Sequence, residues 1–90
     1  MSGKLKLLAD YYLAKSIRVD DKLVEVDFEG EVRKEQIARA QSVLWELGFV
    51  GQNVTLVVGG EKITPGTAAA VARMAKNGPA DIRIRPLKRG

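Results

Sequence analysis

The residue types that could do chemistry are few, because this sequence has no cysteine and no histidine. Without cysteine there are no disulfides, thiolate nucleophiles or zinc–thiolate sites. Without histidine the usual general base and the commonest transition-metal ligand are missing. The serines are Ser2, Ser16 and Ser42, and none of them has a histidine to activate it. The acids around Asp20 lack the spacing of a calcium loop. We therefore expect no enzymatic activity, no metal and no cofactor.

The loop from Gly59 to Thr67 is the best candidate for anion binding. It joins an expected strand to the start of an expected helix, and its glycine, lysine and threonine residues suit a phosphate cradle. The loop does not match the Walker pattern, because no Gly-Lys-Ser/Thr triplet opens the helix. A plain strand–helix connection, with Thr64 as N-cap and Pro65 as the first helical residue, is the favoured interpretation.

The net charge of +4 is unevenly distributed. Acids outnumber bases between residues 20 and 35. From residue 73 onward Asp81 is the only acid beside six bases, Arg73, Lys76, Arg83, Arg85, Lys88 and Arg89. This asymmetry is typical of head-to-tail self-association or of a basic surface that binds an anionic partner. The alternative is that both charged faces are simply exposed to solvent and keep the protein soluble. These six residues are the candidate phosphate or nucleic-acid contacts, although no aromatic residues alternate with them for base stacking.

The hydrophobic pattern predicts the elements that position these residues. Residues 4–15 have helical spacing, although the segment at Tyr11 can equally begin a strand. Alternation over residues 16–29 predicts an antiparallel hairpin with an acidic face toward water. Residues 32–47 form the clearest amphipathic helix, with Gly48 as its C-cap. Residues 54–58 form a strand of the kind covered on both faces, ended by Gly59-Gly60. A helix over 65–77 and a strand over 81–87 follow.

These elements predict a single α/β domain over residues 1–90. An N-terminal helical segment (1–15) precedes a ββαβαβ core (16–87) and a frayed tail (88–90). The core is a mixed four-stranded sheet with the two long helices on one face. We expect the other face to expose apolar residues of the 54–58 strand, covered by the N-terminal segment or by a second chain. That argument favours a homo-oligomer. No apolar run approaches the roughly 20 residues of a membrane span, so we expect a cytoplasmic protein with no membrane partner.

Residues 22–87 resemble a STAS domain, the module of sulfate transporters and anti-sigma-factor antagonists. KLVEVDFEGEV is similar to the family's opening strand, and VTLVVGGEKITPGTAAAVARMAKNGPADIRIRPL is similar to its strand, loop, helix and next strand. The resemblance implies a regulatory module whose loop serine a partner kinase phosphorylates. Here the loop lacks the aspartate and both serines of the D-S-S-G pattern, so only Thr64 or Thr67 can take that part. The chain also stops before the family's final helix and strand.

A second resemblance is to the Clp protease proteolytic subunit and its crotonase-like relatives. FEGEV, VTLVVGG and ITPGTAAAVARM are similar to that family's G-x-V segment, strand and glycine-rich helix start. The sequence ends before the family's catalytic serine, so the resemblance implies no peptidase activity.

The sequence therefore predicts a non-catalytic protein-interaction or regulatory module that self-associates. The expected contact surface is the loop and helix start, with partner-binding residues Lys62, Ile63, Thr64 and Thr67. The alternative is a small basic nucleic-acid-binding protein that uses the arginine-rich C-terminal strand.

Overall fold

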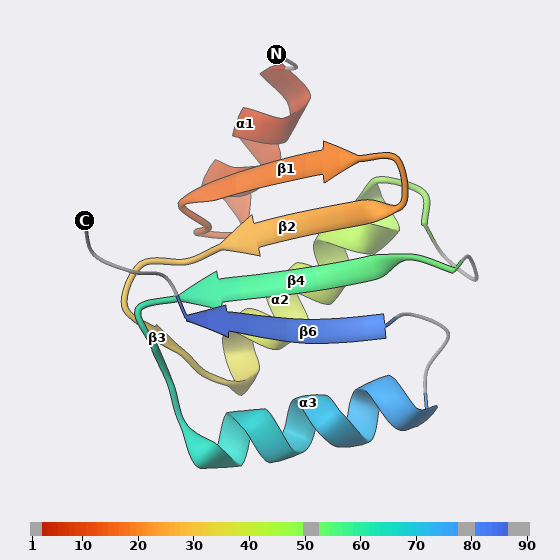
Figure 1. Cartoon of the computed structure of the whole chain (residues 1–90). Helices are drawn as coiled ribbons and strands as arrows, with labels where there is room; N and C mark the ends of the chain where they lie inside the picture. The colour runs from red at the N-terminus through yellow and green to blue at the C-terminus, as the bar shows by residue number, and fades with distance from the viewer. Residues whose placement is uncertain (1–2, 50–52, 78–80, 87–90) are drawn as a thin grey trace.

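The computed structural model describes residues 3–49, 53–77 and 81–86. Its elements, in chain order, are α1 (Gly3–Tyr11), β1 (Ser16–Asp20), β2 (Leu23–Asp27), β3 (Glu31–Val32), α2 (Lys34–Glu46), β4 (Thr55–Gly60), β5 (Lys62–Ile63), α3 (Pro65–Asn77) and β6 (Asp81–Pro86). The main sheet has the strand order β1-β2-β4-β6, with β1 antiparallel to β2 and the other neighbours parallel. The predicted α/β fold with a mixed four-stranded sheet is confirmed (Figure 1).

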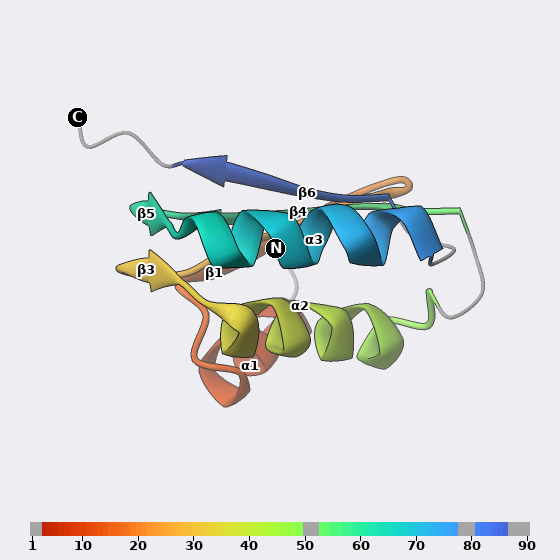
Figure 2. The ribbon, with the colours of Figure 1, turned by 90° about the horizontal axis from the view of Figure 1, so that it is seen from below.

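The helices lie on one side of the main sheet (Figure 2). In that view α1 and α2 lie beneath the sheet, and α3 runs along β6 toward the same side. The prediction that both long helices pack on one face is confirmed. The N-terminal segment packs beside α2 on this face, so the first of the two expected covers for the opposite face, the N-terminal segment, is wrong.

Strand alternation decides which side chains each face carries. The helix side receives a row of aligned apolar residues, of which Val26 and Val58 are fully buried. The next row, on the open face, consists of Ser16, Asp27, Gly59 and Arg85. Of the apolar residues of the 54–58 strand, Val57 lies on the open face and is half-buried, whereas Leu56 and Val58 face the helices. Charged residues of the other strands occupy most of the open face, so the expected apolar surface is limited to Val57 on this strand. The central strand β4 is likewise covered by helices on one face rather than on both.

The core lies between this sheet and α2. The predicted stripe of α2 is confirmed, since Ile37, Ala40 and Leu44 are all buried. They pack in one cluster with residues of β2 and β4 that are almost inaccessible to solvent, among them Val24, Val26, Leu56 and Val58. Removing apolar surface from water stabilises a fold by about 25 cal/mol for each Å² that is buried. This layer is therefore the main source of stability.

The helix ends follow from local sequence. α2 ends at a left-handed Gly48 (φ 85°), where the Phe49 N–H donates to the Leu44 carbonyl at 3.0 Å. This is the predicted Schellman-type stop. α3 begins after Thr64, whose Oγ1 accepts the backbone N–H of Thr67 at 3.2 Å. The predicted N-cap is therefore confirmed.

Two local predictions differ from the structure. The first helix ends at Tyr11 instead of residue 15. Strand β4 continues through Gly59 and Gly60, and the chain then forms the short strand β5, which pairs in parallel with β3. The break expected at these glycines is wrong because Val32 of β3 packs directly over Gly60, where a side chain would collide with it. Such a contact comes from a distant segment, so local sequence does not predict it.

Candidate interaction groove between α2 and α3

An apolar groove lies between the two long helices. It has a volume of about 270 Å³ and is lined by Lys34, Ile37, Ala38 and Gln41 of α2 and by Ala70, Arg73 and Met74 of α3. Apolar atoms make up most of its surface. Since the groove opens to solvent on the helix side of the sheet, its apolar floor is available for contact.

Residue spacing on the two helices explains the groove. Lys34, Ala38 and Gln41 follow each other at four- and three-residue steps, so they lie on one face of α2. Alanine at 38 and at 70 leaves a hollow where larger side chains would fill the space between the helices. Met74 adds a flexible, polarizable wall that adapts to different contacts.

Trp45 extends the α2 side of the groove by one turn. It lies four residues after Gln41 on the same helix face, and 66% of its surface is exposed. It is the only tryptophan of the chain. Its exposure makes this ring an optical probe of anything that binds nearby.

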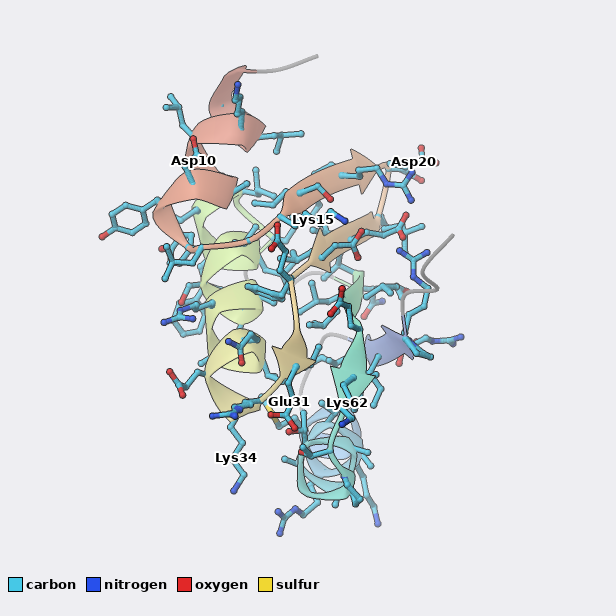
Figure 3. The ribbon with its side chains drawn as sticks, turned by 90° about the vertical axis from the view of Figure 1, so that its left-hand side faces the viewer. Asp10, Lys15, Asp20, Glu31, Lys34 and Lys62 are labelled. Atoms are coloured by element: carbon cyan, nitrogen blue, oxygen red, sulfur yellow. The ribbon has the colours of Figure 1, made fainter. Side chains whose placement is uncertain are left out.

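The groove carries positive charge and no negative charge. Lys34 and Arg73 are exposed at its rim, and none of the described lining residues is acidic. Figure 3 shows Lys34 projecting outward from the first turn of α2. On α2 the acid Glu35 pairs with Arg39 at 3.9 Å, outside the lining. An apolar floor with a cationic rim favours an apolar ligand that also carries a carboxylate.

The structure spreads the predicted partner-binding residues over different environments. Lys62 is exposed, and Ile63 is half-buried against the core. The hydroxyl of Thr64 donates to that of Thr67 at 2.8 Å, and Thr67 is only 3% exposed. Both hydroxyls therefore take part in the helix cap, and Lys62 is the side chain of this set that faces solvent.

The predicted phosphate contacts are also divided. On β6, Arg83 pairs with Asp81 at 3.0 Å, and Arg85 pairs with Glu25 at 2.9 Å. Arg73 and Lys76 are exposed on α3. Lys88 and Arg89 lie outside the described residues. The open sheet face thus presents matched ion pairs.

One end of the molecule exposes large apolar side chains that the sequence analysis did not assign to a binding surface. Leu7 is 70% exposed, Tyr11 76% and Leu13 68%. The available signal is helical spacing, because Leu7 and Tyr11 lie one turn apart and outside the stripe that contains Leu8 and Ala9. The Tyr11 ring rests edge-to-face on Tyr12, with centroids 4.9 Å apart.

Comparison of the chain with protein-family models, with curated proteins and with solved structures finds no match. The resemblances to STAS domains and to Clp proteolytic subunits therefore stay predictions from the motifs. Within the described ranges, the acidic residues form no cluster suited to a metal ion. No helix in the same ranges is long and apolar enough to cross a bilayer.

Proposed function

We propose that this chain is a non-catalytic protein-binding module whose α2–α3 groove takes the apolar face of a short helical segment with an acidic side chain. The observation that carries the proposal is the apolar floor beside Lys34 and Arg73, with no acid in the lining. This is the helix-in-groove mode of recognition, in which residues at i and i+4 insert as anchors.

The size of the groove supports a side-chain anchor over a small-molecule ligand. Its volume of about 270 Å³ lies below the roughly 300–1,000 Å³ of typical small-molecule pockets. A hollow of this size can take one or two large side chains of a helix that lies over it. The exposed Trp45 at its end supplies the kind of aromatic residue that is enriched at binding hot spots.

This proposal keeps the predicted interaction module and moves its contact surface from the Lys62–Thr67 loop to the groove. A STAS-like regulatory role is compatible with it. Nucleic-acid binding receives less support, because Arg83 and Arg85 already face carboxylates. Phosphates would have to displace these acids, at a cost in the ion pairs that are lost.

A peptide titration followed by NMR and by Trp45 fluorescence tests the proposal. The probe is a hydrocarbon-stapled helical peptide with leucines at i and i+4 and a glutamate at i+3; the control peptide has lysine in place of glutamate. The glutamate peptide is expected to shift the amide signals of Ala38, Ala70 and Met74 and the Trp45 emission. The lysine peptide should bind at least about tenfold more weakly, because Lys34 and Arg73 repel it.

Two glutamate substitutions, one inside the groove and one outside it, locate the contact. Ala38→Glu places a carboxylate in the groove and should abolish binding of the glutamate peptide. Ala72→Glu makes the same change at an exposed α3 position outside the lining and should leave binding intact. Absence of groove shifts with either peptide, or equal loss of binding in both variants, would overturn the proposal.

A further inference from the structure

The exposed side of α1 forms an apolar ridge that stands largely in solvent. Leu8 and Ala9 point into the core, whereas Leu7 and Tyr11 stand one turn apart on the outer side. Leu13 lies two residues after the end of the helix and is also well exposed. We call Leu7, Tyr11 and Leu13 the α1 ridge.

The backbone at Leu13 shows that this side chain occupies an unfavourable position. Leu13 has a φ of 59°, at the left-handed residue of a Schellman-type helix end in which the Ala14 N–H donates to the Ala9 carbonyl at 2.8 Å. Glycine is the preferred residue there, and Gly48 fills the same position after α2. At the end of α1 the chain instead has a leucine whose side chain is 68% exposed. The packing of the Leu13 side chain within the monomer does not explain why a leucine stands at this position.

The α1 ridge matches the ligand that the groove requires. Leu7 and Tyr11 supply two anchors at i and i+4, and Asp10 supplies an exposed carboxylate beside them, three residues after Leu7. Figure 3 shows Asp10 on α1, far from Lys34 at the start of α2. Asp10 complements the two cations of the groove rim, Lys34 and Arg73, whereas Lys4 and Lys6 of α1 carry the same charge as the rim.

We infer that the segment bound in the groove is the α1 ridge of a second copy of this chain, so that copies associate head to tail. The inference rests on the proposed function of the groove. α1 and α3 lie at opposite ends of the molecule, so a ridge cannot reach the groove of its own copy (Figure 1). Since the two contacting surfaces differ, the interface is heterologous and produces either an open chain or a closed ring.

Two half-blocked variants test this arrangement by light scattering after size-exclusion chromatography. Leu7→Lys blocks the ridge and keeps the groove, and Ala38→Glu blocks the groove and keeps the ridge. The wild-type mass is expected to rise with concentration beyond that of a dimer or to settle at a closed ring. Each variant alone should weaken association by at least about tenfold, as expected for loss of an anchor. Leu7→Met and Ala72→Glu should associate as the wild type does.

Mixing the two half-blocked variants is the decisive step. Each variant keeps one working surface, so an equimolar mixture should form a dimer and nothing larger. A mixture that stays monomeric, or variants that associate as the wild type does, would overturn the inference. A symmetric wild-type dimer would also overturn it. A wild type that is monomeric at every concentration but binds the glutamate peptide would overturn head-to-tail association and leave the proposed function standing.

Discussion

The guanidinium of Arg85 on β6 reaches across β4 to the carboxylate of Asp27 on β2, with 3.3 Å between Arg85 Nη2 and Asp27 Oδ1. The residue of β4 aligned between them is Gly59, whose missing side chain leaves the path over the sheet open. The same Nη2 lies 2.9 Å from Oε2 of Glu25. The side chains of both acids are only 14% exposed. Glu25 also pairs with Arg18 at 2.6 Å, and Asp27 also accepts a hydrogen bond from the Ser16 hydroxyl at 3.5 Å.

We therefore predict that Arg85→Met lowers the free energy of unfolding by about 1–2 kcal/mol, because the largely buried Asp27 loses its arginine partner and Glu25 keeps only Arg18. Arg83→Met is the matched control on the same strand. Its pair with Asp81 is well exposed, so the loss should stay below about 0.5 kcal/mol. Urea unfolding of the three proteins measures both values. Equal losses in the two variants would show that the contact across β4 has no special role.

Gly60 is a position where only glycine fits. A Cβ there would collide with the side chain of Val32 and lie 3.1 Å from the carbonyl oxygen of Gly30. We predict that Gly60→Ala lowers the free energy of unfolding by about 1–3 kcal/mol, as overpacking of a core does. Gly66→Ala, in the first turn of α3 with open space around it, should instead raise stability by up to about 1 kcal/mol. Thermal unfolding of both variants distinguishes the two cases, and a neutral Gly60→Ala would contradict the close packing.

These two sites also show how far the sequence predicts the structure. Periodicity and caps are local properties, and for that reason the hairpin, α2, α3, Gly48 and the Thr64 N-cap are predicted correctly. The extension of β4 through Gly60 depends on Val32, nearly thirty residues away in the chain, and no local pattern reports it. The pairing of Arg85 with Asp27 likewise requires the register of three strands.

The candidate groove is the part that sequence analysis missed. Its alanines, Ala38 and Ala70, are recognisable as small residues on helices, but the hollow between them exists only because α2 and α3 lie side by side. Helical spacing places the exposed Leu7 and Tyr11 outside the stripe of Leu8 and Ala9, but it does not identify them as a binding surface. Tertiary placement therefore decides both surfaces of the inferred contact.

Titration of the Tyr12 hydroxyl at alkaline pH tests how the residues at the end of α1 pack. Partial burial of the ring raises the pKa of Tyr12 above its ordinary value, and the charge of Glu46 and the neighbouring Tyr11 raise it further. Because the folded state favours the neutral phenol, this stabilising contribution is complete below the unfolded-state pKa and is lost as pH rises through the folded-state pKa. Absorbance titration of tyrosinate should show a late step that disappears in Tyr12→Phe. Glu46→Gln should move this step to lower pH, and an unchanged step would place Glu46 away from the ring.

Substitutions at Leu13 are expected to affect the stability of the monomer and its association with other copies in different ways. Leu13→Gly removes an exposed side chain from a left-handed backbone position, so the free energy of unfolding should rise by about 0.5–1 kcal/mol even after the greater chain entropy of glycine is counted. Leu13→Ala removes the same contacts but keeps the unfavourable backbone, so its stability should stay near that of the wild type. Both variants should weaken head-to-tail association because both shorten the α1 ridge. Urea unfolding at low protein concentration, paired with light scattering at high concentration, measures the two effects separately. A more stable Leu13→Gly that still associates as the wild type does would remove Leu13 from the interface.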